Sequence, residues 1–144
     1  MTNGPAAVLL DTCAVIFMMQ GEPMARPALD AIAHARQVQG ILVSPISAWE
    51  IGLLARPQRG ARALAFVPDP AAWFDRALSY PGVRLAPFTP AIVIASSFLP
   101  GDLHGDPADR LLIATARDVG APLVTSDTRI RAYGEAGHVK VVAC

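Results

Sequence analysis

Cysteine is scarce in this chain, with only Cys13 and Cys144 among its 144 residues. Two cysteines are too few for a disulfide scaffold, so a reducing cytoplasm is the expected location. Long apolar runs are also missing, because no segment reaches the ~18 apolar residues of a membrane span. The stretch VLLDTCAVIFMM is interrupted by Asp11 and has no basic residue before it. We therefore expect neither a signal peptide nor a membrane anchor.

The chain lacks an excess of either charge, since 12 Lys and Arg balance 12 Asp and Glu. A net charge of zero argues against a protein that coats nucleic acid without discrimination. Lysine is nearly absent, because Lys140 is the only one and the other cations are arginines. Arginine binds phosphate in a bidentate way, but it also accompanies an Ala-, Gly- and Pro-rich composition in general. The excess of arginine over lysine could therefore reflect either phosphate binding or the general composition of the chain.

Apolar residues are plentiful, at 53% of the sequence. A chain of 144 residues is close to the commonest domain size and buries roughly two-thirds of the surface that it exposes when unfolded. No repeat, low-complexity tract or linker is evident. We therefore expect a single domain over residues 1–144.

Short apolar segments alternate with helical ones. Strands are predicted at 7–10, 41–43, 83–88, 122–126 and 138–143. Helices are predicted at 12–19, 25–38, 45–54, 69–79, 89–99, 107–119 and 128–133. Several helices begin with Ser, Thr or Asp followed by proline, which is typical of a capped start, and 56–70 is the least regular part. This alternation predicts an α/β fold with a mainly parallel sheet.

Four acidic residues lie in four separate contexts along the chain. Asp11 ends VLLD and Asp127 ends APLVTSD, so both follow strand-like segments, where parallel α/β sheets present their ligands. Glu50 lies in SPISAWEIGLL and Asp109 in HGDPADRLLIATA, which are helix-like. If the four converge, each negative charge raises the pKa of the others. A hard cation such as Mg²⁺ or Mn²⁺ would offset that repulsion, so the pattern favours a metal-dependent phosphodiesterase acting on nucleic acid.

Each of these acids also has a simpler explanation. Asp11 and Asp127 could cap the helices that follow them. A lone glutamate such as Glu50 most often faces solvent, although a carboxylate beside an apolar helix stripe needs a partner. The hydroxyls of Thr125 and Ser126 could orient a carboxylate or a metal-bound water.

The segment before the helix at 107–119 contains two aspartates and a histidine. Asp106 is best explained as an N-cap, because Pro107 follows it and Asp109 then falls in the first helical turn. His104 could be a ligand or a base, but a histidine in a loop is more often solvated.

With these residues in place, the sequence resembles the PIN-domain nucleases, specifically the VapC-type toxins of bacterial toxin–antitoxin pairs. The resemblance covers nearly the whole chain. It rests on LLDT at 9–12, S-x-x-E at 47–50, HGDPADRLLIATA at 104–116 and LVTSD at 123–127. The His-Asp-Pro-Asp-Arg block is its most specific element. Two residues depart from the family pattern, because Ala108 stands where this branch often has Phe and Cys13 where Ser or His is common.

The resemblance implies a three-layer α/β/α sandwich with a mainly parallel central sheet. It also implies an endoribonuclease that depends on Mg²⁺ or Mn²⁺. The family's metal-binding and catalytic acids fall on Asp11, Glu50, Asp109 and Asp127. A metal-activated water would attack the phosphorus of a single RNA strand.

The resemblance further implies a homodimer and an inhibiting antitoxin, whose tail would lie across the helices near 12–38 and 45–66. Arginines at the rim of the site would hold the RNA backbone. The candidates are Arg56, Arg59, Arg62 and Arg110, although an intramolecular salt bridge is the favoured role of Arg110.

Three other functions were weighed against this one. A haloacid-dehalogenase-like phosphatase needs a second Asp two residues after the first, where this chain has Cys13. A response-regulator receiver needs an acidic pair before its phosphorylated Asp and a late strand-end lysine, and neither is evident. A PIN-like module that binds RNA or a partner without cutting remains the serious alternative, although retention of all four carboxylates argues against it.

Overall fold

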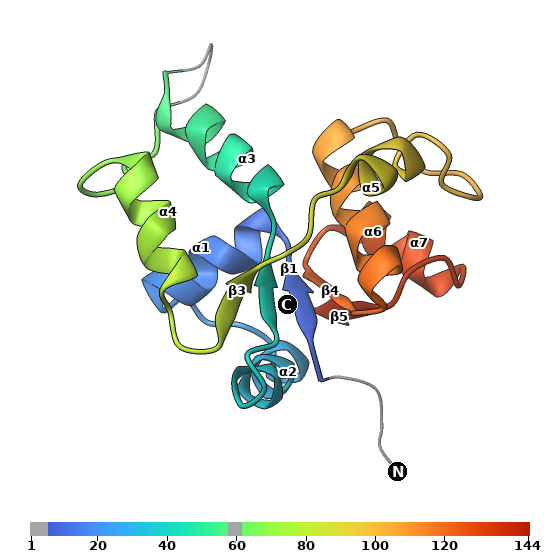
Figure 1. Ribbon diagram of the computed structural model, residues 1–144, viewed down its shortest axis with the longest axis horizontal. Coiled ribbons are helices and arrows are strands. Elements are labelled where there is room, and N and C mark those ends of the chain that lie inside the picture. Colours follow the sequence, from blue (N-terminus) through green and yellow to red (C-terminus); the bar gives the residue numbers. More distant parts are fainter. Residues whose placement is uncertain (1–5, 58–61) are drawn as a thin grey trace.

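The computed structural model describes residues 6–57 and 62–144 (Figure 1). Within these ranges the strands are β1 (Val8–Leu10), β2 (Ile41–Val43), β3 (Val83–Leu85), β4 (Leu123–Thr125) and β5 (Val141–Ala143). The helices are α1 (Thr12–Gln20), α2 (Arg26–Arg36), α3 (Pro45–Ala55), α4 (Pro70–Leu78), α5 (Pro90–Ala95), α6 (Pro107–Val119) and α7 (Thr128–Glu135). None of the helices in the described ranges combines the length and apolar character that a membrane crossing requires.

The strands form one sheet in the order β3-β2-β1-β4-β5. Every pairing in the described sheet is parallel, and the central residue Leu9 of β1 lies beside Leu42 of β2 and Leu123 of β4. The prediction of a mainly parallel central sheet is therefore confirmed.

Helices cover both faces of the sheet, and the alternation of side chains along β1 divides the core. Val8 and Leu10 pack into a cluster with residues of α1, α2, α3 and α4, whereas Leu9 packs into a second cluster with residues of α6 and α7. Both clusters are buried, which explains why the central strands β1 and β2 are continuous apolar runs rather than alternating ones. This arrangement is the expected three-layer α/β/α sandwich.

Local capping fixes where four of the helices begin. Ser44, Asp69, Thr89 and Asp106 each accept a hydrogen bond from a main-chain N–H of the following helix, and proline occupies the first helical turn each time. Side-chain oxygens at this position satisfy donors that the helix leaves unpaired. The predicted starts of these helices are therefore confirmed.

Element ends differ from the prediction by a few residues. The helix expected over 89–99 ends at Ala95, and the strand expected over 83–88 ends at Leu85. The main-chain N–H of Ala86 still pairs with Val43 O at 2.8 Å, but Pro87 has no N–H with which to continue the ladder. Conversely, α7 continues to Glu135 rather than ending at residue 133.

Candidate active site at the carboxyl edge of the sheet

Two of the four predicted acids follow the two strands at the centre of the sheet. Asp11 comes directly after β1, and Asp127 comes two residues after β4. Because β1 and β4 are parallel neighbours, both residues lie at the same edge. In the sheet, β2 lies on one side of β1 and β4 lies on the other, so the strand order changes direction at β1. Parallel α/β sheets bind ligands at such switch points.

The other two acids come from helices that meet at this edge. Glu50 lies in α3, which follows β2, and Asp109 lies in the first turn of α6. The two helices are in contact, and Figure 1 shows them on either side of the carboxyl ends of the central strands. The charge of Asp109 raises the pKa of both Asp11 and Glu50. The structure therefore brings acids from four elements within electrostatic range of one another.

Asp11 is the most buried of the four, with 8% of its surface exposed. Its Oδ1 accepts a hydrogen bond from Ala14 N at 2.8 Å, so it does cap α1. Burial raises the pKa of Asp11, the hydrogen bonds from Thr125 and Ala14 lower it, and the charges of Asp109 and Asp127 raise it again. The balance is a raised pKa, because a buried anion beside other anions is poorly stabilised. Asp11 is thus a helix cap and a destabilised carboxylate at once.

Glu50 is half-buried and has a partner, so the alternative of a solvent-facing glutamate is excluded. The hydroxyl of Thr12 donates a hydrogen bond to its Oε1, and Thr12 Oγ1 also lies 3.0 Å from Ser47 Oγ. Burial raises the pKa of Glu50, and the hydrogen bond from Thr12 lowers it. The charges of Asp109, Asp106 and Asp11 raise it further, so the pKa is raised on balance. Sequence analysis missed Thr12 and Ser47, although both lie inside the LLDT and S-x-x-E motifs.

Asp109 is held by two neighbours from its own sequence block. Asp106 Oδ1 accepts from Asp109 N at 3.0 Å, which confirms Asp106 as the cap of α6. His104 Nε2 lies 2.7 Å from Asp109 Oδ2, and only 14% of the His104 side chain is exposed. The expectation of a solvated His104 is therefore wrong. Burial raises the pKa of Asp109, and the hydrogen bond from His104 only partly offsets this rise.

Arg110 is also placed differently from the prediction. Its guanidinium donates to three carbonyl oxygens, those of Ser96 at 2.9 Å and of Leu103 and His104 at 3.4 Å each. It forms no ion pair with any residue in the described ranges, so the expected salt bridge is wrong, although its role is intramolecular. Of the other arginines predicted for the rim, Arg56 and Arg62 are exposed, and Arg59 lies outside the described residues.

Asp127 differs electrostatically from the other three acids. Its Oδ1 accepts from Arg129 N at 2.8 Å and Ile130 N at 3.0 Å, so it caps α7. The guanidinium of Arg129 lies 3.7 Å from its Oδ2. Burial alone would raise the pKa of Asp127, but these hydrogen bonds and the charge of Arg129 outweigh burial and lower it. Asp127 is therefore readily ionised at neutral pH.

The four side chains offer only oxygen donors, which suit a hard divalent cation. Asp11 and Glu50 have no basic partner among the described residues, so no ion pair offsets the charge of these two carboxylates. Even so, across 6–57 and 62–144 no three His, Cys, Asp or Glu side chains are arranged to hold a metal ion. The structure gathers suitable ligands at one edge without directing three of them at a common point.

Comparisons with known proteins agree with this fold. The family model described as PIN domain matches residues 8–136. Ribonuclease VapC22 of Mycobacterium tuberculosis (strain ATCC 25618 / H37Rv) is 34% identical over 128 residues, which cover 88% of this chain and 91% of that protein.

Solved structures with the same fold include VapBC2 from Rickettsia felis bound to a DNA fragment from their promoter. That structure has a TM-score of 0.66 and 15% identity, covering 95% of this chain and 98% of the other. FitAcB from Neisseria gonorrhoeae has a TM-score of 0.55 and 21% identity, covering 94% and 96%. The family match spans most of the sequence and includes all four acids, so this chain belongs to the PIN domain family.

Proposed function

We propose that this protein is a metal-dependent endoribonuclease that cleaves RNA phosphodiester bonds with an activated water. The proposal is supported by the position of Asp11, Glu50, Asp109 and Asp127 at one edge of the sheet, near enough for the charge of Asp109 to raise the pKa of both Asp11 and Glu50. Burial and mutual repulsion raise the pKa of the first three. Such a cluster is relieved by a bound cation. The 34% identity with a protein named ribonuclease VapC22 supports the same activity.

The four acids would hold Mg²⁺ or Mn²⁺, and the ion would supply positive charge for the scissile phosphate and a water of lowered pKa. Around them, Thr12 fixes the orientation of Glu50 through its hydroxyl. Thr125 does the same for Asp11 and also accepts from Asp127 N at 3.0 Å. These hydroxyls hold the carboxylates in place, so less ordering remains when a cation binds.

One arginine is well placed for the phosphate backbone of the substrate. Arg129 lies beside Asp127, and 59% of its side chain is exposed. It lines a hollow of about 440 Å³ together with His104. Arg110, in contrast, spends its donors on main-chain carbonyls. We therefore assign the RNA contact at this edge to Arg129 rather than to Arg110.

The decisive experiment is a cleavage assay on a panel of single-stranded RNAs. Wild-type protein is expected to cut at least one RNA with Mn²⁺ or Mg²⁺ and none with excess chelator. Asp11→Asn should remove activity under all conditions, because it removes a charged ligand while keeping the helix cap. If the wild type binds RNA but never cuts it, the non-catalytic module would be the correct function.

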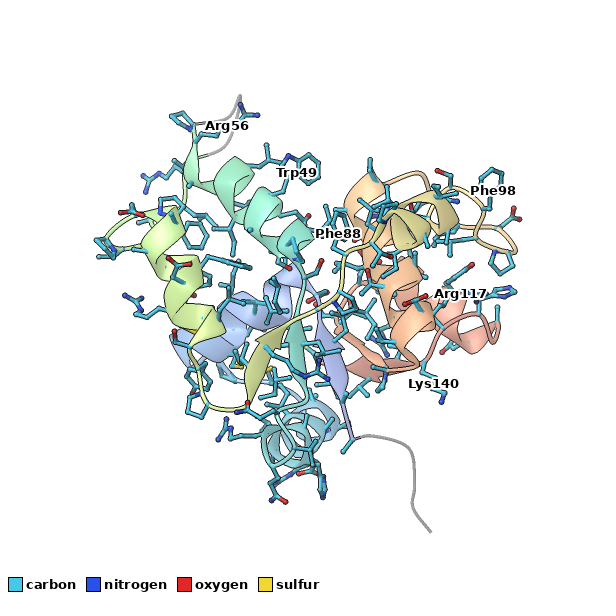
Figure 2. All side chains as sticks on the ribbon, viewed as in Figure 1. Trp49, Arg56, Phe88, Phe98, Arg117 and Lys140 are labelled. Carbon is cyan, nitrogen blue, oxygen red and sulfur yellow. The ribbon has the colours of Figure 1, made fainter. Side chains whose placement is uncertain are left out.

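We further propose that the protein is the toxin of a toxin–antitoxin pair and forms a homodimer. Large apolar side chains on its surface support burial in an assembly. Trp49 of α3 is 51% exposed and Phe98 is 79% exposed, and Figure 2 shows both at the periphery of the molecule. The predicted antitoxin path over α1, α2 and α3 includes the helix that carries Trp49.

Co-expression tests the partner. The protein alone is expected to suppress growth of a bacterial host, and the small gene adjacent to its own should restore growth. The purified pair should elute well above the 15.2 kDa of one chain. A non-toxic, monodisperse monomer that binds no product of a neighbouring gene would contradict the toxin assignment and leave the nuclease proposal standing.

A further inference from the structure

His104 occupies a position that the stability of the fold does not explain. Only 14% of its side chain is exposed, and its Nδ1 atom is buried without a hydrogen-bond partner in the described part of the chain. A buried polar atom without a partner costs free energy, and such atoms are rare in folded proteins. The other nitrogen, Nε2, is the one that contacts Asp109, at 2.7 Å. This contact is the evident reason for holding the ring at this position.

The loop that carries His104 is held against α6 by hydrogen bonds from a residue of that helix. Arg110, the residue after Asp109, donates to the carbonyl oxygens of Leu103 and His104 at 3.4 Å each. It also donates to Ser96 O at 2.9 Å, at the end of α5. The loop therefore cannot move away from α6 without breaking these bonds, and His104 is held against the first turn of the helix.

The contact restricts Asp109 in a specific way. A carboxylate only accepts hydrogen bonds, so Nε2 of His104 must be the donor to Oδ2. No residue in the described ranges donates to the other oxygen, Oδ1. The main-chain N–H of Asp109 is bonded to Asp106 at 3.0 Å. Main chain and side chain are thus both fixed, with one carboxylate oxygen left free.

We propose that His104 is a positioning residue, which orients the Asp109 carboxylate so that its free oxygen binds a divalent cation. This inference rests on the proposed metal-dependent function. It gives each polar residue of the His-Asp-Pro-Asp-Arg block a role at the same site. His104 orients the acid, Asp106 caps the helix, Asp109 is the ligand, and Arg110 fixes the loop. Hydrogen-bond partners of this kind typically change metal affinity by about 10- to 100-fold.

Calorimetric titration of Mn²⁺ into the full chain tests the role of His104 without depending on catalysis. His104→Leu removes the donor at similar bulk and should raise the dissociation constant about tenfold or more. His104→Gln places an amide nitrogen near the position of Nε2 and should stay within about threefold of the wild type, because the donor is restored. His138→Leu is the matched control. Its ring packs 4.7 Å from that of Tyr133 and makes no hydrogen bond to the four acids, so its affinity should match the wild type.

Thermal unfolding without metal separates positioning from a structural role. His104→Leu removes the unpaired Nδ1 but also the hydrogen bond to Asp109, and because these two effects oppose each other its unfolding midpoint should change little. Wild-type affinity for Mn²⁺ in His104→Leu would overturn the inference while leaving the proposed function intact. Equal weakening in the Leu and Gln variants, with lowered midpoints in both, would make His104 structural and also overturn it. A wild-type protein that binds no Mn²⁺ would overturn the proposed function and the inference together.

Discussion

Asp109→Asn is expected to abolish RNA cleavage, whereas Asp106→Asn, three residues earlier, should retain most of it. Asp109 lies within electrostatic range of Asp11, Glu50 and Asp127, and the amide of asparagine could not replace a charged ligand. A loss of about 4 kcal/mol of transition-state stabilisation corresponds to about a thousandfold in rate. Among the described residues, Asp106 makes one side-chain hydrogen bond, in which it accepts the N–H of Asp109, and asparagine caps helices about as well as aspartate. Initial rates on one RNA with Mn²⁺, measured side by side, check the difference.

Asp106→Asn and Asp109→Asn control for each other, because both exchange one carboxylate oxygen for an NH₂ group at the start of α6. Their unfolding midpoints should lie close to that of the wild type, so that lost activity cannot be blamed on unfolding. Equal loss of cleavage in both variants would show that Asp106 belongs to the metal site. Full activity in Asp109→Asn would remove Asp109 from it.

Asp11→Asn is expected to change stability in opposite directions with and without metal. In the metal-free protein, burial and the charges of Asp109 and Asp127 raise the pKa of Asp11, which means that its charge destabilises the fold. Asparagine removes the charge and keeps the cap on α1, so the metal-free variant should be more stable than the wild type at neutral pH. With Mn²⁺ at about 100 times its dissociation constant, the wild type should gain about 2.7 kcal/mol. The variant should gain far less.

Denaturant unfolding with and without Mn²⁺ measures this reversal. Asp69→Asn provides the control, because Asp69 caps α4 by accepting from Ala72 N at 2.8 Å and is exposed. It should change little in either condition and should keep the full gain from Mn²⁺. If Mn²⁺ stabilises Asp11→Asn as much as the wild type, Asp11 is not a ligand.

Much of the fold follows from local signals in the sequence. The apolar runs of β1, β2 and β4 and the cap-proline starts at Ser44, Asp69, Thr89 and Asp106 each depend on neighbouring residues only. A proline in the first turn and a side-chain acceptor before it stabilise a helix start without help from distant parts of the chain. The predicted ends of helices and strands were less accurate. The helix predicted over 89–99, for example, ends at Ala95, because the stability of a last helical turn depends on what packs against it.

The errors at the candidate site have one physical source. His104 was expected in solvent and Arg110 in a salt bridge, yet they contact Asp109 and main-chain carbonyls respectively. Their partners depend on the path of the loop over residues 96–106, which contains no periodic pattern. Spacing along the chain could place the acid at the start of α6, but it carried no information about how the preceding loop folds back on it.

Asp11 and Asp127 show most clearly what the sequence determined and what it could not. Each is an aspartate between an apolar strand and a helix, and the sequence alone predicted both as candidate ligands and candidate caps. Only the tertiary structure makes them electrostatically different. Asp11 follows the central strand and is buried near other acids, which raises its pKa, whereas the more open Asp127 has Arg129 beside it and a lowered pKa. Desolvation and charge depend on residues that folding brings close, so neighbours in the sequence cannot set them.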